Sequence, residues 1–478
     1  MMRKFYILFA LILLIPRVIA EELPELGDYS ATVMSALDEK RIANQIMRDV
    51  MASDEVLDDA EVNEYITALG NKLVAGGPDK SQSFNFFVVR DNSINAFAMP
   101  GGVIGVHTGL MIAARNEGEL AGVLGHEIGH VVQHHIARML AQQKNDSVIN
   151  MAGMALALLA ARANPQLSSA AMMTSSASMV QKRLDYTREH EREADRVGIQ
   201  ILENAGYDTT AMAGFFEVLQ KGTRFVEGSA PSFLRTHPIT TERIADVSAR
   251  AGKNKFKLQA YSAEFDLIRA KLLASLGPPT QSISNFQENL QQQRYTSLTA
   301  QHYGLALAYL RANNIAAARK ELAWLESNSK GHPYFANLAA QIEVEAKNPQ
   351  QAEKQFIKGL QRYPWHLALI IGYARHHIEL GQYDKALQLI QEKQAAFPDN
   401  PQLYELKAKA YLALNKRMLS FQSQGEAYFR RYNVAKAFEQ MDLAVKAGDG
   451  DFYEASIVEA RANELKKMLD VPKKDSLF

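Results

Sequence analysis

The sequence predicts a mainly helical α+β domain followed by an all-α superhelix of repeated helical pairs. The first half mixes helical periodicity with a few short strand patterns, and one of its helices carries two histidines four residues apart. The second half shows a period of 34 residues. We place the first domain at residues 21–255 and the repeat domain at residues 256–478, after a leader at residues 1–20.

The leader has the pattern of a secretory signal peptide. Two basic residues precede the apolar run Phe5–Ile15, and Val18 and Ala20 suit cleavage before Glu21. The run is too short to span a bilayer. The chain has no cysteine and carries 53 basic and 53 acidic residues. An exported protein without disulfides fits a bacterial periplasm, and a balanced charge gives no reason to expect a nucleic-acid partner.

Two helices and a small sheet follow the leader. Helical patterns cover Asp28–Val50 and Asp58–Val74. Three strand patterns come next, and we expect them to form a small antiparallel sheet with a turn at Pro100-Gly101-Gly102. These strands are Ser83–Arg90, Ser93–Met99 and Gly102–His107.

The segment Asn95-Ala96-Phe97-Ala98 is the candidate substrate-binding strand. A strand beside an active site can bind a peptide backbone as an added strand without demanding a particular sequence. Small side chains at Ala96 and Ala98 would let that peptide come close. The alternative is an ordinary edge strand with Phe97 in the core.

The central motif is His126-Glu127-Ile128-Gly129-His130. A capping pattern at Asn116 and Glu119 and an apolar stripe predict one helix over Glu117–Leu140. Two histidines four residues apart share a helix face and can bind one tetrahedral metal, while the glutamate can act on a water there. We therefore predict metal-assisted hydrolysis, with His134 in a structural role. Three glycines in this helix call for close approach by neighbouring backbone, namely Gly122, Gly125 and Gly129.

The segment Val148–Ala161 is apolar all round. It is too short to cross a membrane. It fits three roles, which are a buried core helix, a lid over the active site, and a surface that grips unfolded protein or makes peripheral contact with a membrane. The pattern does not decide between them.

A zinc site that keeps one position open for water needs a third protein ligand. The segment Tyr186–Gly198 is helical and dense in charge. Glu191 and Asp195 lie one turn apart on the same face, so Glu191 could ligate while Asp195 bonds to a ligand imidazole. Other residues compete for these roles, and spacing alone does not choose among them: Glu189, His190 and Glu193.

The chain from about Asn95 to Glu242 resembles the zinc endopeptidase family that includes the CAAX prenyl proteases and their bacterial relatives. The resemblance implies a zincin-like metalloprotease domain with one Zn²⁺ per chain, in which Glu191 is the third ligand and Asp195 supports a ligand. The multi-span membrane domain of the prenyl proteases is absent, so the resemblance points to the soluble periplasmic branch. The motifs that carry it are N-A-F-A-x-P-G-G at Asn95–Gly102, H-E-x-G-H at His126–His130 and E-x-x-x-D at Glu191–Asp195.

A further histidine, His237, stands in a predicted loop within Arg235-Thr236-His237-Pro238, before a helix that opens at Thr240. A loop histidine could occupy the open zinc position and hold the enzyme latent until it is displaced. Most loop histidines do not, but this T-H-P element resembles one near the site in the soluble relatives. His237 is therefore a candidate fourth ligand or latency switch.

The second half has the spacing of tetratricopeptide repeats. Small residues at two fixed places in each unit let the paired helices pack closely, and the array forms a concave surface that binds protein. Four units run over Thr299–Ala435, and helical pairs at Ala263–Leu290 and Lys436–Leu469 can cap the array. The alanines that recur 34 residues apart are Ala306, Ala340, Ala374 and Ala408, and Ala318, Ala352 and Ala386.

Together the two domains predict a periplasmic zinc endopeptidase with a protein-binding repeat domain. In this mechanism His126, His130 and Glu191 hold zinc, and Glu127 is the general base and then the acid. The combination resembles the beta-barrel assembly-enhancing proteases. That resemblance implies cleavage of misfolded or stalled outer-membrane proteins, chaperone-like help in their assembly, and the outer-membrane beta-barrel assembly machinery as a partner. The alternative is a non-enzymatic chaperone or adaptor acting through the repeats, which a closed four-ligand site including His237 would favour.

Overall fold

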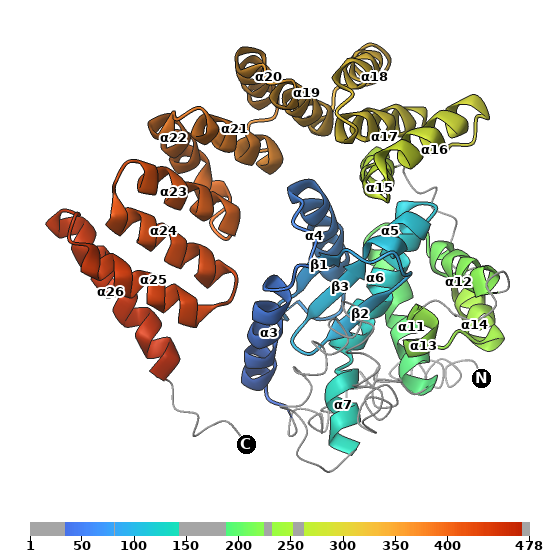
Figure 1. Ribbon diagram of the computed structural model, residues 1–478. Coiled ribbons are helices and arrows are strands. Elements are labelled where there is room, and N and C mark those ends of the chain that lie inside the picture. The colour runs from blue at the N-terminus through green and yellow to red at the C-terminus, as the bar shows by residue number, and fades with distance from the viewer. Residues whose placement is uncertain (1–33, 81, 143–187, 224–231, 252–261, 471–478) are drawn as a thin grey trace, which may run out of the picture.

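The computed structural model describes residues 34–80, 82–142, 188–223, 232–251 and 262–470 (Figure 1). These residues form a mainly helical first part with one three-stranded sheet, followed by an arc of paired helices. The predicted fold class is confirmed. The leader at residues 1–20 and the apolar segment at residues 148–161 lie outside the described residues.

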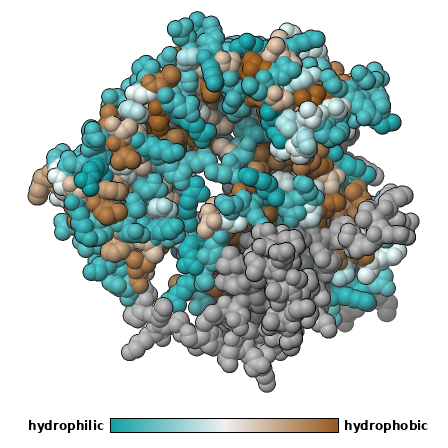
Figure 2. Space-filling model, in the orientation of Figure 1, coloured by the Kyte–Doolittle hydropathy of each residue, from teal (hydrophilic) through white to brown (hydrophobic). Residues whose placement is uncertain are grey.

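The next features are the hydropathy of the surface and the length of the apolar helices. Hydrophilic residues cover most of the face seen in Figure 2, with smaller hydrophobic groups between them. Within the part of the chain that the structure describes, no helix is both long enough and apolar enough to span a membrane.

The first part begins with α3, which starts at Ala36, and the start predicted at Asp28 lies outside the described residues. Ser35 and Asp38 form a capping box there, because the Ser35 side chain accepts from the Asp38 amide and the Asp38 side chain accepts in return. The elements of the first part are α3 (Ala36–Met51), α4 (Ala60–Ala75), β1 (Asn85–Val89), β2 (Ala96–Met99), β3 (Val103–His107), α5 (Thr108–Ala113), α6 (Glu117–Val132), α7 (His135–Gln142), α11 (Arg188–Asn204), α12 (Thr210–Thr223), α13 (Ser232–Thr236) and α14 (Thr241–Ala251).

The sheet is mixed, and the prediction of an antiparallel sheet was wrong. Its order is β1-β3-β2, with β2 and β3 antiparallel and β1 parallel to β3. Alternating hydrophobicity identifies strands but not their partners. The central place of β3 agrees with its burial, because all five of its residues are buried, as expected of a strand covered on both faces.

Helices cover both faces of the sheet. On one face α3 packs Ile46 and Val50 against Phe87 of β1. On the other face Phe86 and Val88 lie in the main core together with residues of α4 and α6. The alternation of β1 thus sends side chains into two cores rather than into one core and solvent.

The two edges of the sheet differ. The outer edge of β1 pairs with the segment before α4, where the Leu57 amide donates to the Val88 carbonyl and the Arg90 amide donates to the Glu55 carbonyl. The other edge belongs to β2, and no described strand pairs with its outer side. An unpaired edge next to an active site can accept an extended peptide.

Helices α6 and α11 approach each other closely at glycines. A Cβ on Gly129 would lie 2.9 Å from the Ala194 carbonyl oxygen, and a Cβ on Gly125 would lie 3.3 Å from that of Gly198. Gly122 meets the backbone of α12 in a similar way. The predicted reason for glycines inside this helix is confirmed, because neighbouring backbone occupies the space of the missing side chains.

The helix predicted over Glu117–Leu140 is in fact two helices. α6 ends at Val132 and α7 begins at His135, with His134 at a φ of +49° between them. A left-handed residue directly after the C-cap is a common way for a helix to end, and five other helices of the described chain end in the same way at a residue other than glycine. The His134 imidazole lies 3.2 Å from the Glu39 carboxylate of α3, away from the motif histidines.

The second part is an arc of six helical pairs within residues 262–470 (Figure 1). The alanines that define the 34-residue period are all buried, those of one register in the first helices of the pairs and those of the other in the second. The pairs are α15 (Ala263–Ser275) and α16 (Pro279–Gln291), α17 (Leu298–Arg311) and α18 (Ile315–Asn328), α19 (Pro333–Glu345) and α20 (Pro349–Arg362), α21 (Leu367–Glu379) and α22 (Tyr383–Lys393), α23 (Pro401–Ala413) and α24 (Arg417–Arg430), and α25 (Val434–Ala447) and α26 (Phe452–Asp470).

The arc curves around the N-terminal end of α4, where Glu61 is buried (Figure 1). The Glu61 carboxylate accepts from Lys271 of α15 at 2.6 Å and from Asn337 of α19 at 2.8 Å, and it lies 3.1 Å from His366 before α21. The main apolar core also runs from α4 through α15, α17 and α19. Since the core continues across it, the boundary at residues 255 and 256 stays a prediction.

Candidate metal centre

Helix α6 brings the two motif histidines together. The Nε2 atoms of His126 and His130 lie 3.0 Å apart, and both side chains are fully buried. This closeness follows from their spacing of four residues, which places them on one face in successive turns.

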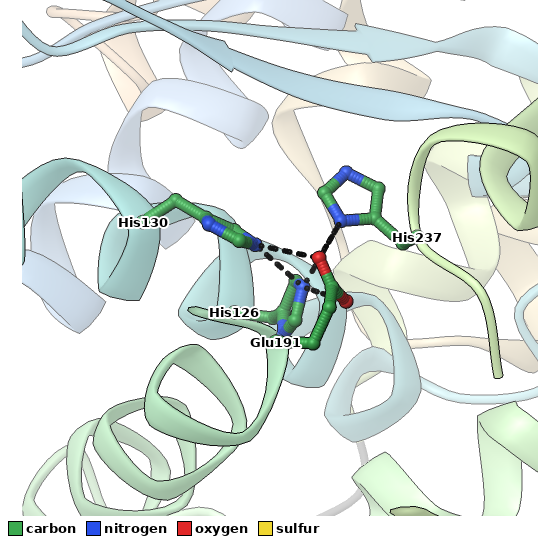
Figure 3. A group of neighbouring side chains, drawn as sticks. All are labelled: His126, His130, Glu191 and His237. Atoms are coloured by element: carbon green, nitrogen blue, oxygen red, sulfur yellow. Dashed lines mark hydrogen bonds and ion pairs between the residues drawn. The ribbon is translucent and has the colours of Figure 1, made fainter. Parts of the chain in front are cut away.

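Two other segments bring further donors to the same point (Figure 3). Glu191 of α11 places its carboxylate oxygens 3.5 Å from His126 Nε2 and 3.4 Å from His130 Nε2. His237 follows α13, and its Nδ1 lies 2.9 Å from Glu191 and 3.4 Å from His126 Nε2. His237 directly follows α13 and lies in the short loop before α14, as predicted, and it is part of the cluster.

The spacing of these four donors fits a divalent metal. Ligand atoms about 2.0–2.1 Å from a tetrahedral zinc lie about 3.3 Å from one another. The candidate ligand atoms of His126, His130, Glu191 and His237 all lie within 4.8 Å of each other, and the contacts among them are 2.9–3.5 Å. Imidazole and carboxylate donors suit zinc and several other divalent transition metals.

The charges of the cluster also suit a cation. Burial alone would raise the pKa of Glu191, but the three surrounding histidines outweigh it and hold that pKa well below its usual range. Burial likewise disfavours a charged His126, yet its bonds to Asp195 and Glu191 raise the pKa of His126 to about 10. A buried, ionised carboxylate among imidazoles therefore stabilises positive charge at this point.

Asp195 supports the cluster from one turn further along α11. Its Oδ1 atom lies 2.9 Å from His126 Nδ1, on the side of the ring away from the other donors. A carboxylate in this place fixes the tautomer and orientation of an imidazole that binds metal through Nε2. Both competing carboxylates of α11 lie elsewhere, since Glu189 is exposed and Glu193 pairs with Arg138.

Arg243 of α14 is a site residue that the sequence did not reveal. Its guanidinium donates to both Asp195 oxygens at 2.8 Å and lies 2.6 Å from a Glu191 oxygen. It also donates to the Pro238 carbonyl at 2.8 Å, next to His237. The signal was indirect: two acidic side chains on one buried helix face require a cation, but nothing in the local sequence says which.

Glu127 is buried beside the cluster. Within the described residues its two carboxylate oxygens have no hydrogen-bond partner, and one of them lies 3.5 Å from His237 Nε2. A buried carboxylate without a hydrogen bond is costly, so its presence indicates a function that outweighs this cost.

The candidate substrate-binding strand, β2, has one backbone edge that no described strand pairs with, but both of its faces are packed against other residues. Ala96 and Ala98 are buried in the main core, so their small side chains face inward and do not line a peptide path. Phe97 points to the other face, where its ring meets Phe87 edge to face at 5.9 Å. The Asn95 side-chain oxygen is buried and has no hydrogen-bond partner among the described residues. The backbone edge of β2 is what remains for a peptide.

Comparison with known proteins agrees with this geometry. The family model "Peptidase family M48" matches residues 59–251, and a tetratricopeptide-repeat model matches residues 343–410. The "Beta-barrel assembly-enhancing protease" of Escherichia coli (strain K12) is 28% identical over 458 residues, which cover 94% of this chain and 92% of that protein.

Shorter relatives match the first part of the chain. The "Metalloprotease YcaL" of Escherichia coli (strain K12) is 31% identical over 235 residues, covering 48% of this chain and 86% of that protein. The "Mitochondrial metalloendopeptidase OMA1" of Arabidopsis thaliana is 31% identical over 191 residues, covering 40% of this chain and 36% of that protein. The chain is therefore a metallopeptidase, a hydrolase of peptide bonds. It belongs to peptidase family M48 and carries tetratricopeptide repeats after its peptidase domain.

Proposed function

We propose that this protein is a periplasmic zinc endopeptidase that degrades misfolded or stalled outer-membrane proteins and assists their assembly. One observation carries the proposal: a buried set of metal donors stands beside the unbonded carboxylate of Glu127. A relative that matches along nearly the whole chain is named a beta-barrel assembly-enhancing protease, which supports the proposed substrate class and the assembly machinery as a proposed partner. The predicted signal peptide at residues 1–20 supports the periplasm.

His126, His130 and Glu191 would hold the zinc ion, which, when bound there, supplies a Lewis acid for the scissile carbonyl. Glu127 would remove the proton from the attacking water and pass it to the leaving amine. Asp195 would hold His126 in the tautomer whose Nε2 faces the metal. The supporting distances are those within the cluster and the 2.9 Å contact of Asp195 with His126.

His237 would be a latency switch. Its Nδ1 lies among the donors, in the place that an open catalytic site reserves for water, and its Nε2 faces Glu127. Such a fourth donor was expected to favour a non-enzymatic chaperone, but the names of the relatives favour a peptidase. A closed state that opens when His237 moves reconciles the fourth donor with a peptidase activity.

The open edge of β2 would bind the substrate backbone as an added strand. Main-chain pairing gives affinity without demanding a sequence, which suits unfolded proteins of many kinds. The support is the position of β2 at the sheet edge and its packing against α6, which carries the motif.

The repeats would bring substrate or the assembly machinery to the peptidase domain. A cavity of about 510 Å³ lies between the start of α4 and the inner helices of the arc, and it is lined by Asp59, Lys271, Asn337 and Arg375 among others. The lining mixes charged and polar side chains with apolar ones such as Phe356 and Ile371, and such a mixture suits a peptide with varied side chains.

The test is degradation of an unfolded outer-membrane protein by the mature chain, comparing wild type with Glu127→Gln at equal bound zinc. We expect cleavage by wild type, and a loss of about 10²–10⁴-fold in the variant because the general base is gone. Equal, measurable cleavage by both proteins would remove Glu127 from the mechanism. If neither cleaves, the protein is either latent or a chaperone, and the His237→Ala variant separates these two cases.

His237→Ala tests latency in the same assay. If His237 closes the site, this variant should cleave faster than wild type, while the double variant His237→Ala, Glu127→Gln should stay inactive. No gain in the single variant would mean that His237 does not restrain the enzyme.

A further inference from the structure

The geometry points to His135 as the positioning residue for His130, and this inference rests on the proposed metal site. His135 Nδ1 lies 2.8 Å from His130 Nδ1, and both side chains are fully buried. His130 presents its other nitrogen, Nε2, to the donor cluster. His135 therefore contacts His130 at the one ring nitrogen that a metal would leave free.

The contact between His130 and His135 determines which ring nitrogen of each histidine carries a hydrogen. If His130 binds a metal through Nε2, its Nδ1 carries a hydrogen and donates it to His135 Nδ1. His135 must then carry its own hydrogen on Nε2, which lies 3.1 Å from a Glu193 carboxylate oxygen. Arg138 donates to the same oxygen at 2.8 Å. Each donor in this series of hydrogen bonds thus meets an acceptor, and the series ends at the ionised carboxylate of Glu193.

The two motif histidines are consequently supported in different ways. His126 meets the Asp195 carboxylate directly, whereas His130 reaches the Glu193 carboxylate through the ring of His135. The His190 ring stacks on His135 with centroids 4.5 Å apart, which restricts the rotation of that ring. His135 is thereby held in one orientation from two sides.

The break between α6 and α7 makes the contact possible. On a continuous helix, residues five apart point about 140° away from each other, so His130 and His135 could not meet. The interruption at Gln133 and His134, with its positive φ, turns His135 back toward His130. His134 is the left-handed residue that commonly follows a helix end, and here it also sets the direction of α7 so that His135 meets His130.

Zinc affinity of the full chain, measured by competition with a chelating indicator, tests this role. The matched pair is His135→Leu and His135→Asn, because the two side chains have similar size but the asparagine oxygen can replace Nδ1 as the acceptor. We expect His135→Leu to bind zinc about 10–100-fold more weakly and His135→Asn to recover most of that loss. His134→Asn serves as the control and should bind like wild type, because it removes the neighbouring imidazole while asparagine tolerates the positive φ at this position.

If His135 only fills space, His135→Leu should bind zinc at least as tightly as His135→Asn, since a buried site tolerates leucine at least as well as asparagine. Equal zinc affinity of His135→Leu and wild type would overturn the inference, as would an equal loss in both variants. The visible absorption of the Co²⁺-loaded proteins gives a second readout, and it should change in His135→Leu and return in His135→Asn. If wild type itself binds no zinc, the proposed metal site fails and this inference fails with it.

Discussion

Arg243 carries the positive charge that faces both carboxylates of α11. It is fully buried, and its fork of donors matches Asp195 while another nitrogen reaches Glu191. Arginine suits this place because its planar guanidinium bonds to a carboxylate through two nitrogens at once. Burial opposes its charge, but the two carboxylates outweigh that effect and raise the pKa of Arg243.

Replacing this charge should destabilise the protein strongly. We expect Arg243→Met to lower the free energy of unfolding of the metal-free chain by about 3–5 kcal/mol, because it leaves buried carboxylates uncompensated. Urea unfolding in the presence of a chelator measures the loss. Arg192→Met is the control, since Arg192 pairs with Glu242 on the surface and should cost less than about 1 kcal/mol. Similar losses in both variants would contradict the role given to Arg243.

The sequence predicted the residues of the centre that belong to a local motif. His126, Glu127 and His130 stand at fixed spacing, and Glu191 and Asp195 do so within one turn. Arg243 and His135 could not be predicted in this way. The first comes from a helix far along the chain, and the second reaches His130 through a backbone break that an unbroken apolar pattern hides.

At the scale of elements, the packing of α6 on α11 sets the distance between the donors on these two helices. No side chain separates the backbones at Gly129, where an added Cβ would lie 2.9 Å from the Ala194 carbonyl oxygen and 3.2 Å from its Cα. Ala194 neighbours Asp195, so a shift of α11 at this point also moves that carboxylate.

Gly129→Ala should therefore be harmful although alanine favours helices. Alanine gains about 1 kcal/mol in helix propensity, but overpacking against backbone costs about 1–3 kcal/mol, and the helices must separate. We expect lower stability in urea and weaker zinc binding. Gly214→Ala in α12 is the control, because its Cβ would meet the end of the flexible Arg115 side chain at 3.2 Å. The prediction fails if Gly129→Ala is as stable as the control and binds zinc as tightly as wild type.

The sequence also predicted the elements better than their arrangement. Strand positions and the turn at Pro100-Gly101-Gly102 agree with the structure, because alternation and turn residues are local signals. The parallel pairing of β1 with β3 was missed because β2 lies between these two strands in the sequence. The repeats were the most predictable part, since each unit repeats the same local packing at Ala340, Ala374 and their equivalents.

At the scale of the whole molecule, Glu61 joins the peptidase part to the repeats. Burial would raise the pKa of Glu61, but Lys271 and His366 lower it from 4.5 to about 2. Two nearby ionisable groups also have shifted pKa values, and the charge of Glu61 acts on both of them. Burial raises the pKa of Glu64 to about 7, and burial lowers the pKa of His332 to about 4.

The sign of the pH effect follows from the lowered pKa. A carboxyl group with a depressed pKa in the folded state stabilises the protein above its unfolded pKa and loses this contribution as pH falls through the folded value. For Glu61 the window runs from pH 4.5 down to about 2, and a shift of this size corresponds to about 3 kcal/mol. Acid in this range should therefore weaken the attachment of the repeats to α4.

Comparison of wild type with Glu61→Gln measures the contribution of the Glu61 charge together with its effect on Glu64 and His332. We expect the difference in the free energy of unfolding to be largest above pH 5 and to shrink as pH falls toward 3, measured by urea unfolding at each pH. Glu343→Gln is the control from the same repeats, since Glu343 pairs with the largely exposed Arg319 and should give a small difference. If the difference for Glu61→Gln does not change between pH 6 and pH 3, the buried network at Glu61 does not depend on its charge, and the repeats are held to the peptidase part by apolar contacts alone.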